Sequence, residues 1–437
     1  MKRYFLYKSA IVASLSGFLF GFDTVVISGA EQSIQQVWNL SNTMHGLAIS
    51  IALWGTVLGA LIGKLPTENL GRKKTLMLVG LLYTTSAIGS AFAPEVFSFI
   101  LFRFIGGLGI GISTIVAPIY ISEIAPSEKR GRLTGLFQFN IVFGILVAYI
   151  SNALLSSSID DSWRWMLGIE TLPAIVFLLL CFSLAESPRW LIVKSDDTAN
   201  AQKIFLLINP HMEKLALRQL MDDIIHSASK KKVETPFFSK ALSKPILLGF
   251  FIAFFNQLSG INAILYFAPR IFAMSGLEEQ SALLQSVGIG LTNIIFTFIG
   301  LKFIDKLGRK KLLYIGCAGY ILSLGSCSWA FYSGQEAIVP YCIFSFIASH
   351  AIGQGAVIWV FISEIFPNKH RDSGQTLGSF THWFFAASLT LLFPMMVEHF
   401  SPSLIFGFFC TMMVIQAFWI NFYVPETKGK ALEEIEV

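Results

Sequence analysis

Long apolar runs alternate with short polar segments along the whole chain. A helix needs about 20 apolar residues to cross the ~30 Å hydrocarbon core of a bilayer, and each run is close to that length. The pattern therefore predicts membrane-spanning helices from one end of the chain to the other. The twelve expected spans lie near residues 9–30, 45–64, 74–94, 98–121, 133–155, 164–185, 247–272, 283–302, 311–332, 339–363, 376–397 and 402–424.

One polar stretch, residues 190–244, is much longer than the others and separates the sixth expected span from the seventh. Its basic residues include Lys194, Lys203, Lys214, Arg218, Lys230, Lys231 and Lys232. We expect this stretch to form short amphipathic cytoplasmic helices. The predicted fold is an all-α membrane protein with an N-terminal six-helix half (1–189), this linker (190–244), and a C-terminal six-helix half with a short cytoplasmic tail (245–437).

Three short motifs occur twice, once in each predicted half. The pairs are ENLGRKK and DKLGRKK, which begin at Glu68 and Asp305; SEIAPSEKR and SEIFPNKHR, at Ser122 and Ser363; and ESPR and ETKG, at Glu186 and Glu426. The offsets of 237, 241 and 240 residues are nearly equal. Such an internal repeat predicts two related halves, an architecture that places a substrate site between them.

The composition supports a membrane protein rather than a soluble one. Hydrophobic residues make up 54% of the 437 positions and charged residues 14%, whereas a soluble protein carries about 25% charged residues. The five cysteines lie within apolar runs, without metal-ligand or disulfide spacing. We therefore expect no metal site and interpret the cysteines as packing residues.

Lysine and arginine gather on one side of the expected membrane. They occur in MKRYFLYK at the N-terminus, both GRKK segments, EKRGR at 128–132, the linker and NKHR at 368–371, whereas SSSIDDS at 156–162 has none. Cytoplasmic loops are enriched in these residues, so we predict both termini to be cytoplasmic in the cell (inner or plasma) membrane. Since no small-residue cleavage site precedes an expected polar turn at Glu31, we expect the first span to be uncleaved.

Several longer motifs occur together. They are SEIAPSEKRGR, ESPRWL, NQLSGINAILYFAP, DKLGRKK, SEIFP and PETKGKALEEIE. Together they resemble the sugar porter family of the major facilitator superfamily over essentially the whole chain, and are most similar to bacterial sugar–proton symporters of the xylose–proton type. The resemblance implies the major facilitator fold and import of a monosaccharide by alternating access. We expect no cofactor, no nucleic-acid partner and a monomer in the bilayer.

The resemblance also implies a sugar site. Its residues would be Gln138, Asn256, Gln257, Asn262, Tyr266, Asn293 and Trp359. Where the family has two glutamines, Gly-Pro, and an amide before a tryptophan, this chain has Asn256-Gln257, Gly355-Ala356 and His382-Trp383. These departures leave the identity of the sugar open.

The residue types themselves also favour sugar binding. A neutral amide offers an acceptor and two donors, which suits a ligand with several hydroxyls better than an ion. Gln257 lies about 11 residues into its span, ~16 Å at 1.5 Å per residue, near the midplane, and SGIN at 259–262 could loosen the helix there. The face of Trp359 suits a sugar ring, and Phe20 is a weaker candidate for that role. Hydrogen bonding between helices is the alternative for the amides and for His382.

Three ionisable residues lie at similar depth inside the first six spans, about 8–10 Å below the outer edge at 1.5 Å per residue. They are Asp23, Arg103 and Glu170. Charges within a membrane usually pair and mark ion or proton routes. We predict that Asp23 carries the coupled proton with Arg103 as its partner, and that Glu170 tunes the pair. In the family an aspartate here accompanies symport; a static ion pair is the alternative.

Charged residues also recur in the cytoplasmic loops of both halves. They are Glu68, Arg72, Lys73, Glu123, Arg130, Glu186 and Arg189, and in the second half Asp305, Arg309, Lys310, Glu364, Arg371 and Glu426. The positive-inside rule accounts for the basic residues but not for carboxylates at repeating positions. In the family such groups form a network that holds the cytoplasmic side shut when the site faces out.

The leading hypothesis is a proton-coupled sugar symporter. A uniporter that passes sugar down its gradient is an alternative of the same kind, and a sugar sensor without transport is an alternative of another. An enzyme is not expected, because no Ser/Lys, Ser/His or di-Asp pair shares a depth in the spans. The glycine-rich GGLGIGIS at 106–113 lies inside a span and does not fit a nucleotide-binding motif, so we expect its glycines to permit close helix packing.

Overall fold

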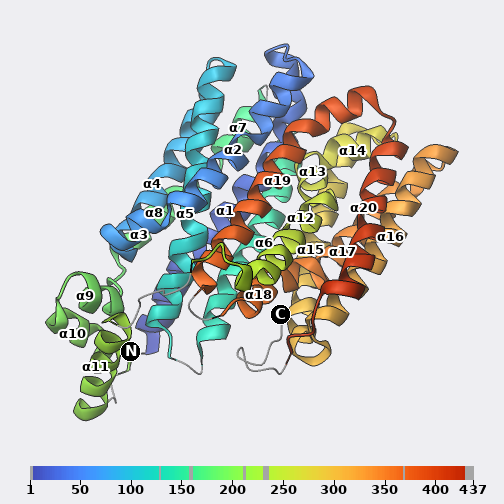
Figure 1. Cartoon of the computed structure of the whole chain (residues 1–437). Helices are drawn as coiled ribbons and strands as arrows, with labels where there is room; N and C mark the ends of the chain where they lie inside the picture. The colour runs from blue at the N-terminus through green and yellow to red at the C-terminus, as the bar shows by residue number, and fades with distance from the viewer. Residues whose placement is uncertain are drawn as a thin grey trace.

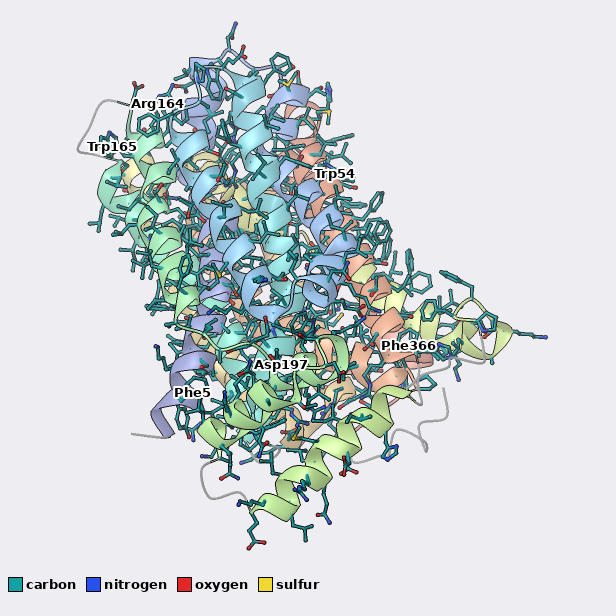
Figure 2. The ribbon with its side chains drawn as sticks, turned by 90° about the vertical axis from the view of Figure 1, so that its left-hand side faces the viewer. Phe5, Trp54, Arg164, Trp165, Asp197 and Phe366 are labelled. Carbon is teal, nitrogen blue, oxygen red and sulfur yellow. The ribbon has the colours of Figure 1, made fainter. Side chains whose placement is uncertain are left out.

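The computed structural model describes residues 3–126, 129–156, 161–209, 213–229, 236–367 and 370–428. Throughout these residues the regular structure is helical. The long helices run side by side in one bundle, and three short helices, α9–α11, lie at one end of it (Figure 1). Phe5, Asp197 and Phe366 lie toward that end, whereas Arg164 and Trp165 lie toward the opposite end (Figure 2).

The N-terminal half and the linker contribute eleven of the described helices. They are α1 (Arg3–Val37), α2 (Asn42–Ile62), α3 (Lys64–Asn69), α4 (Arg72–Ala91), α5 (Val96–Ile124), α6 (Arg130–Leu155), α7 (Ser162–Gly168), α8 (Thr171–Phe182), α9 (Pro188–Lys194), α10 (Thr198–Ile208) and α11 (Lys214–Ser229). The C-terminal half contributes α12 (Ser243–Leu258), α13 (Ile261–Tyr266), α14 (Ala268–Met274), α15 (Glu279–Leu307), α16 (Arg309–Ser333), α17 (Val339–Ile352), α18 (Gln354–Ile365), α19 (Arg371–His399) and α20 (Pro402–Tyr423). Short 3₁₀ turns at Lys240–Leu242 and Glu336–Ile338 precede α12 and α17.

Eleven helical segments in the described part are long and apolar enough to cross a membrane. The one expected span that is missing from these eleven is the third, residues 74–94. It corresponds to α4, which has 20 residues but begins with RKK and contains TTSAIGS. These small polar residues lower its hydropathy, and its buried face packs against α5 and α8 instead of lipid. The structure thus confirms the predicted all-helical fold.

Three of the spans are interrupted. The seventh breaks between α12 and α13, where Gly260 has a φ of +85°, a left-handed conformation that glycine adopts without strain; this confirms the loosening expected at 259–262. The tenth breaks at Gly353, between α17 and α18, and the sixth breaks between α7 and α8, next to Glu170. Neither of the last two breaks was expected from the sequence.

The first helix is longer than its apolar run. It continues to Val37, so Glu31 lies inside α1 and not in a polar turn. The expected turn was wrong because Glu31 is fully buried and ion-paired, which offsets the unfavourable burial of its charge. The helix can therefore continue past it.

Glycines allow the helices of the N-terminal half to pack closely. A Cβ atom at Gly107 or Gly111 of α5 would collide with the backbone of α2. Small residues at helix contacts are typical of membrane bundles, so the glycine-rich segment at 106–113 has the packing role expected for it. The linker helices have their own small apolar core, formed by residues such as Leu191, Phe205 and Leu217.

Candidate functional site

Amide side chains of the seventh span form a buried hydrogen-bonded cluster with one histidine. Gln257 donates from Nε2 to Asn256 Oδ1 (2.8 Å), and its Oε1 accepts from Asn262 Nδ2 (2.6 Å). The same Nε2 lies 3.2 Å from both ring nitrogens of His382 on α19. In a continuous helix, residues five apart do not face each other. The break at Gly260 therefore brings Asn262 back against Gln257.

Aromatic rings extend this cluster toward the N-terminal half. The rings of Trp359 and His382 have centroids 5.1 Å apart, and those of His382 and Trp383 are 4.7 Å apart and nearly perpendicular. Phe20 of α1 meets Trp383 edge-on at 5.5 Å. Trp359, His382 and Phe20, all expected from the sequence, thus belong to one aromatic row. Trp383, which the site prediction omitted, lies between Phe20 and His382 and contacts both rings.

The remaining predicted sugar residues form no described hydrogen bond with the amide cluster. Gln138 on α6 is half-buried and forms no hydrogen bond that the structure describes. Asn293 on α15 has a long contact of 3.4 Å with the Thr297 hydroxyl. Tyr266 is fully buried, its hydroxyl has no partner among the described residues, and it lies beside Arg103. The structure therefore places Tyr266 next to the charged residues of the first half.

Asp23, Arg103 and Glu170 form a single buried cluster. Arg103 donates from Nη1 to Asp23 Oδ1 and from Nη2 to the backbone oxygen of Asp23 (3.2 Å). Glu170, at the break between α7 and α8, lies beside both residues. All three are at most 2% exposed, and Asp23 Oδ2 and Glu170 Oε1 have no hydrogen-bond partner in the described chain. Arg103 is thus ion-paired with Asp23, and the second carboxyl group, that of Glu170, is buried beside this pair.

This cluster has the composition of a proton site. A buried charge is stable only when it is paired, and one arginine balances only one of the two carboxylates. The trio is neutral when it also holds one proton. A movement that separates Arg103 from the carboxyl groups would change which state is favoured.

The chain is similar to known transporters over its whole length. The family described as "Sugar (and other) transporter" matches residues 9–437. The D-xylose-proton symporter of Escherichia coli K12 is 33% identical, with 99% of this chain and 95% of that protein covered. The arabinose-proton symporter of Bacillus subtilis is 35% identical, with 99% and 94% covered. This chain belongs to the sugar transporter family.

Solved structures agree with that assignment. The inward-open conformation of the xylose transporter XylE from E. coli has a TM-score of 0.88 at 32% identity, and 99% of each chain is covered. The proton:xylose symporter XylE bound to 6-bromo-6-deoxy-D-glucose has a TM-score of 0.82, with 100% of this chain and 99% of that one covered. This sugar transporter is therefore a multi-pass membrane protein with the major facilitator fold, and not an enzyme.

An ion cluster that was not expected from the sequence joins the two halves of the transporter. Glu31 of α1 accepts from Arg270 of α14 at both carboxylate oxygens (2.9 and 2.7 Å) and lies 2.8 Å from His45 Nε2 of α2. Glu31 and His45 are fully buried. Arg270 also donates to Gln35 (2.7 Å). The sequence does contain a signal for this pair, because Glu31 and Arg270 lie at the same end of spans one and seven. The signal was missed because the first span was predicted to end near residue 30, before Glu31.

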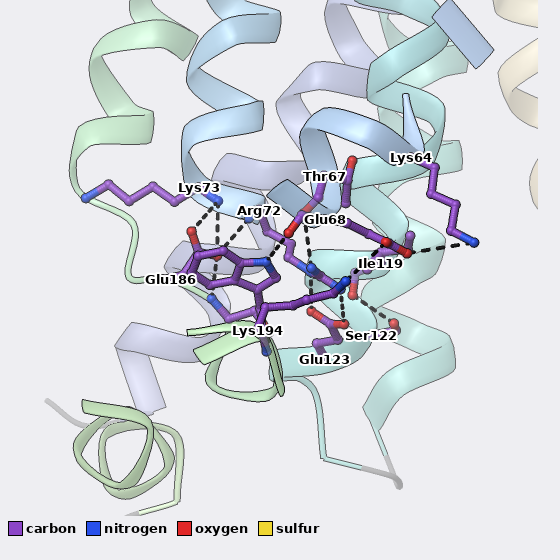
Figure 3. Close-up of polar contacts among 12 residues, drawn as sticks. Lys64, Thr67, Glu68, Arg72, Lys73, Ile119, Ser122, Glu123, Glu186 and Lys194 are labelled. Carbon is purple, nitrogen blue, oxygen red and sulfur yellow. Dashed lines mark hydrogen bonds and ion pairs between the residues drawn. The ribbon is translucent and has the colours of Figure 1, made fainter. Parts of the chain in front are cut away.

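At the other end of the bundle, the charges of the N-terminal half form a compact network (Figure 3). Arg72 binds Glu123 with two parallel bonds, Nε–Oε2 at 2.9 Å and Nη2–Oε1 at 2.8 Å. Glu186 accepts from the backbone N–H groups of Arg72 (2.8 Å) and Lys73 (3.2 Å). Burial raises the pKa of Glu186 above its usual value, and these backbone N–H groups oppose the rise. The network ties the start of α4 to the ends of α5 and α8.

The C-terminal half repeats this network. Arg309 binds Glu364 through Nε (3.0 Å) and Nη2 (2.7 Å). Glu426 accepts from the backbone N–H groups of Arg309 (2.9 Å) and Lys310 (3.1 Å). The same arrangement of loop charges thus occurs in both halves, and each ion pair named here stays within one half.

The other predicted loop residues differ between the halves. Glu68 pairs with Lys194 of the linker (3.4 Å), whereas Asp305 pairs with Arg309 (3.3 Å). Arg130 donates to a backbone oxygen (3.2 Å), and Arg189 forms no ion pair that the structure describes. Arg371 is the first residue of α19. The positions Glu128, Lys230, Lys231, Lys232 and Lys369, in segments noted as basic in the sequence, lie outside the described residues.

Proposed function

We propose that this chain is a proton-coupled monosaccharide symporter that imports a pentose or hexose by alternating access. The observation that carries the proposal is the buried trio of Asp23, Arg103 and Glu170, which has one carboxyl group more than its arginine can balance. Relatives named as xylose- and arabinose-proton symporters support it. A pure uniporter has no need for such a trio.

The sugar would bind against the amide cluster and the aromatic row. The proposed site comprises Gln138, Asn256, Gln257, Asn262, Tyr266, Asn293, Trp359, His382 and Phe20. In the structure the amides bond to one another and to a histidine. An incoming sugar would exchange those bonds for bonds to its hydroxyls, so no buried polar group is left without a partner.

The short helix α13 is suited to couple sugar to proton. Asn262 and Tyr266 are four residues apart on it, so they lie on the same helix face one turn apart. Asn262 belongs to the amide cluster, and Tyr266 lies beside Arg103 and Asp23. Since α13 is flanked by breaks at both ends, we propose that it moves as a unit when sugar binds. That movement would shift Tyr266 against the trio and alter its proton occupancy.

The charged groups at the two ends of the bundle would act as gates. The Glu31–Arg270 ion pair joins α1 to α14 and holds the halves together at the end opposite α9–α11. We propose that this end is extracellular and that both termini are cytoplasmic. The loop network of each half would then contact that of the other half when the cytoplasmic side closes. The division into residues 1–189, 190–244 and 245–437 belongs to the same proposal, as does a monomer in the lipid bilayer.

Uptake into proteoliposomes tests the function directly. Purified transporter would be screened with radiolabelled D-xylose, L-arabinose and D-glucose, with and without an imposed pH gradient (inside alkaline). The proposal predicts accumulation of at least one sugar above equilibrium only with the gradient. Equilibration unaffected by the gradient would instead establish the uniporter. Binding without uptake would establish the sensor.

A further inference from the structure

The tenth span contains hydrogen-bonding capacity that no described protein group uses. His350 lies three residues before the break at Gly353, and its Nδ1 is 2.6 Å from the Tyr320 hydroxyl. Its Nε2 forms no hydrogen bond among the described residues, and the His350 side chain is only partly buried. Gln354, just after the break, is 1% exposed with both amide atoms unpartnered. Buried polar groups are almost always hydrogen-bonded, so a polar ligand at this break would satisfy groups that the described chain leaves without a partner.

His350 lies close to the proposed sugar site. It neighbours His382, which contacts Gln257 at 3.2 Å and stacks on Trp359. A Cβ atom at Gly355 would lie 3.3 Å from His350 Nε2. The absence of a side chain at Gly355 therefore leaves space next to this nitrogen.

Tyr320 holds the His350 ring in this position. Tyr320 is fully buried, with its ring centroid 5.1 Å from that of Phe346. It also lies beside Ser259, whose hydroxyl donates to the backbone oxygen of Asn256 (2.6 Å). Tyr320 thus contacts the interrupted seventh and tenth spans, and its hydroxyl is hydrogen-bonded to Nδ1 of His350. The ring is left with Nε2 as its single remaining hydrogen-bonding atom.

We infer that His350 Nε2 is a substrate-facing group that hydrogen-bonds one sugar hydroxyl, with Tyr320 as its positioning residue. The inference deepens the proposed function and rests on it. The hydroxyl selected would be one that the amide cluster does not reach, because His350 projects from the tenth span and the amides from the seventh. His350 therefore adds to specificity rather than to binding strength alone.

Binding of deoxy sugars identifies the contact. Calorimetry would compare the purified transporter with His350→Phe, His350→Asn and Tyr320→Phe, using D-xylose, L-arabinose, D-glucose and the monodeoxy analogues of the sugar that binds. His399→Phe, an exposed position on α19, serves as the control. We expect His350→Phe to bind the parent sugar about tenfold more weakly, but to bind one monodeoxy analogue as well as the wild type does.

The conservative variants separate contact from positioning. His350→Asn, which retains a donor and an acceptor, should recover affinity to within about threefold of wild type. Tyr320→Phe should bind the parent sugar somewhat more weakly than the wild type does, and should bind the same monodeoxy analogue as well as the wild type does. Equal losses for every analogue in His350→Phe, or no loss at all, would overturn the inference while leaving the proposed function intact. If the wild type bound none of the sugars, the proposed function would fail and this inference with it.

Discussion

At the end of the bundle that carries α9–α11, the two halves of the transporter carry the same arrangement of charges, one copy each. Arg72 grips Glu123 as Arg309 grips Glu364, with two parallel bonds in each case. Glu186 caps the start of α4 as Glu426 caps the start of α16. The repeat in the sequence is therefore a repeat of a structural brace.

Within the membrane the halves differ. The first half buries Asp23, Arg103 and Glu170, whereas the second buries the amides Asn256 and Gln257 beside the partly buried His382. Ionisable carboxyl groups suit proton transfer, and neutral amides suit hydroxyls. We propose that the shared scaffold serves the movement of both halves, while the first half binds the proton and the second supplies most of the sugar site.

Removing the acidic member of the ion pair should have the largest effect. We expect Asp23→Asn to abolish uphill, pH-driven uptake while sugar binding and counterflow exchange persist. The fold should survive because Glu170 remains beside Arg103 and balances its charge. Uptake in proteoliposomes measures the effect, with the exposed Asp223→Asn as a matched control. Normal accumulation by Asp23→Asn would remove this residue from proton coupling.

Removing amides from the second half should weaken sugar binding without uncoupling transport. We expect Gln257→Ala and Asn262→Ala each to lower sugar affinity about 10- to 100-fold, since each leaves a sugar hydroxyl or a neighbouring amide without a partner. Calorimetry or tryptophan quenching with the bound sugar measures this. Wild-type affinity in both variants would place the sugar elsewhere.

The cytoplasmic braces should respond alike in the two halves. Because Arg72 and Arg309 make equivalent bonds, we expect Arg72→Ala and Arg309→Ala to shift the transporter toward inward-facing states by similar amounts, about two- to tenfold. Labelling of a cytoplasmic-side cysteine probe reports the shift, and Arg130→Ala and Arg371→Ala extend the test to the remaining arginines. Unchanged labelling in all four variants would exclude a gate.

The smallest effect is expected at His382. It contacts Gln257 and Trp359 and stands where the family has an amide, so His382→Gln should alter the order of sugar preference by a few-fold. A competition assay with a panel of aldoses measures that order. An identical order in wild type and variant would reduce His382 to a contact between helices.

Much of this arrangement could be predicted from the sequence because the membrane constrains it. Span positions follow from apolar run lengths, and the pairing of Asp23 with Arg103 follows from their equal depth. The break at Gly260 also followed from local residue types. The break at Gly353 did not, since glycines are frequent in these spans and others, such as Gly107, pack as closely inside unbroken helices.

Contacts between distant spans were harder to predict. Glu31 looked like a turn residue because its stabilising partner, Arg270, lies 239 positions away. Tyr266 was predicted as a sugar residue from the motif that it shares with Asn262, and that motif did not reveal that Tyr266 also lies beside Arg103. Depth can pair distant charges only when both are placed inside spans, and the predicted turn placed Glu31 outside one.

The division of labour between the halves is tested most directly by sugar-induced proton uptake. A pH electrode would record alkalinisation when sugar is added to de-energised proteoliposomes containing wild type, Asp23→Asn or Gln257→Ala. The account predicts a signal for wild type, none for Asp23→Asn at any sugar concentration, and a full signal for Gln257→Ala once sugar is raised 10- to 100-fold. Proton uptake retained by Asp23→Asn, or lost in Gln257→Ala at saturating sugar, would contradict it.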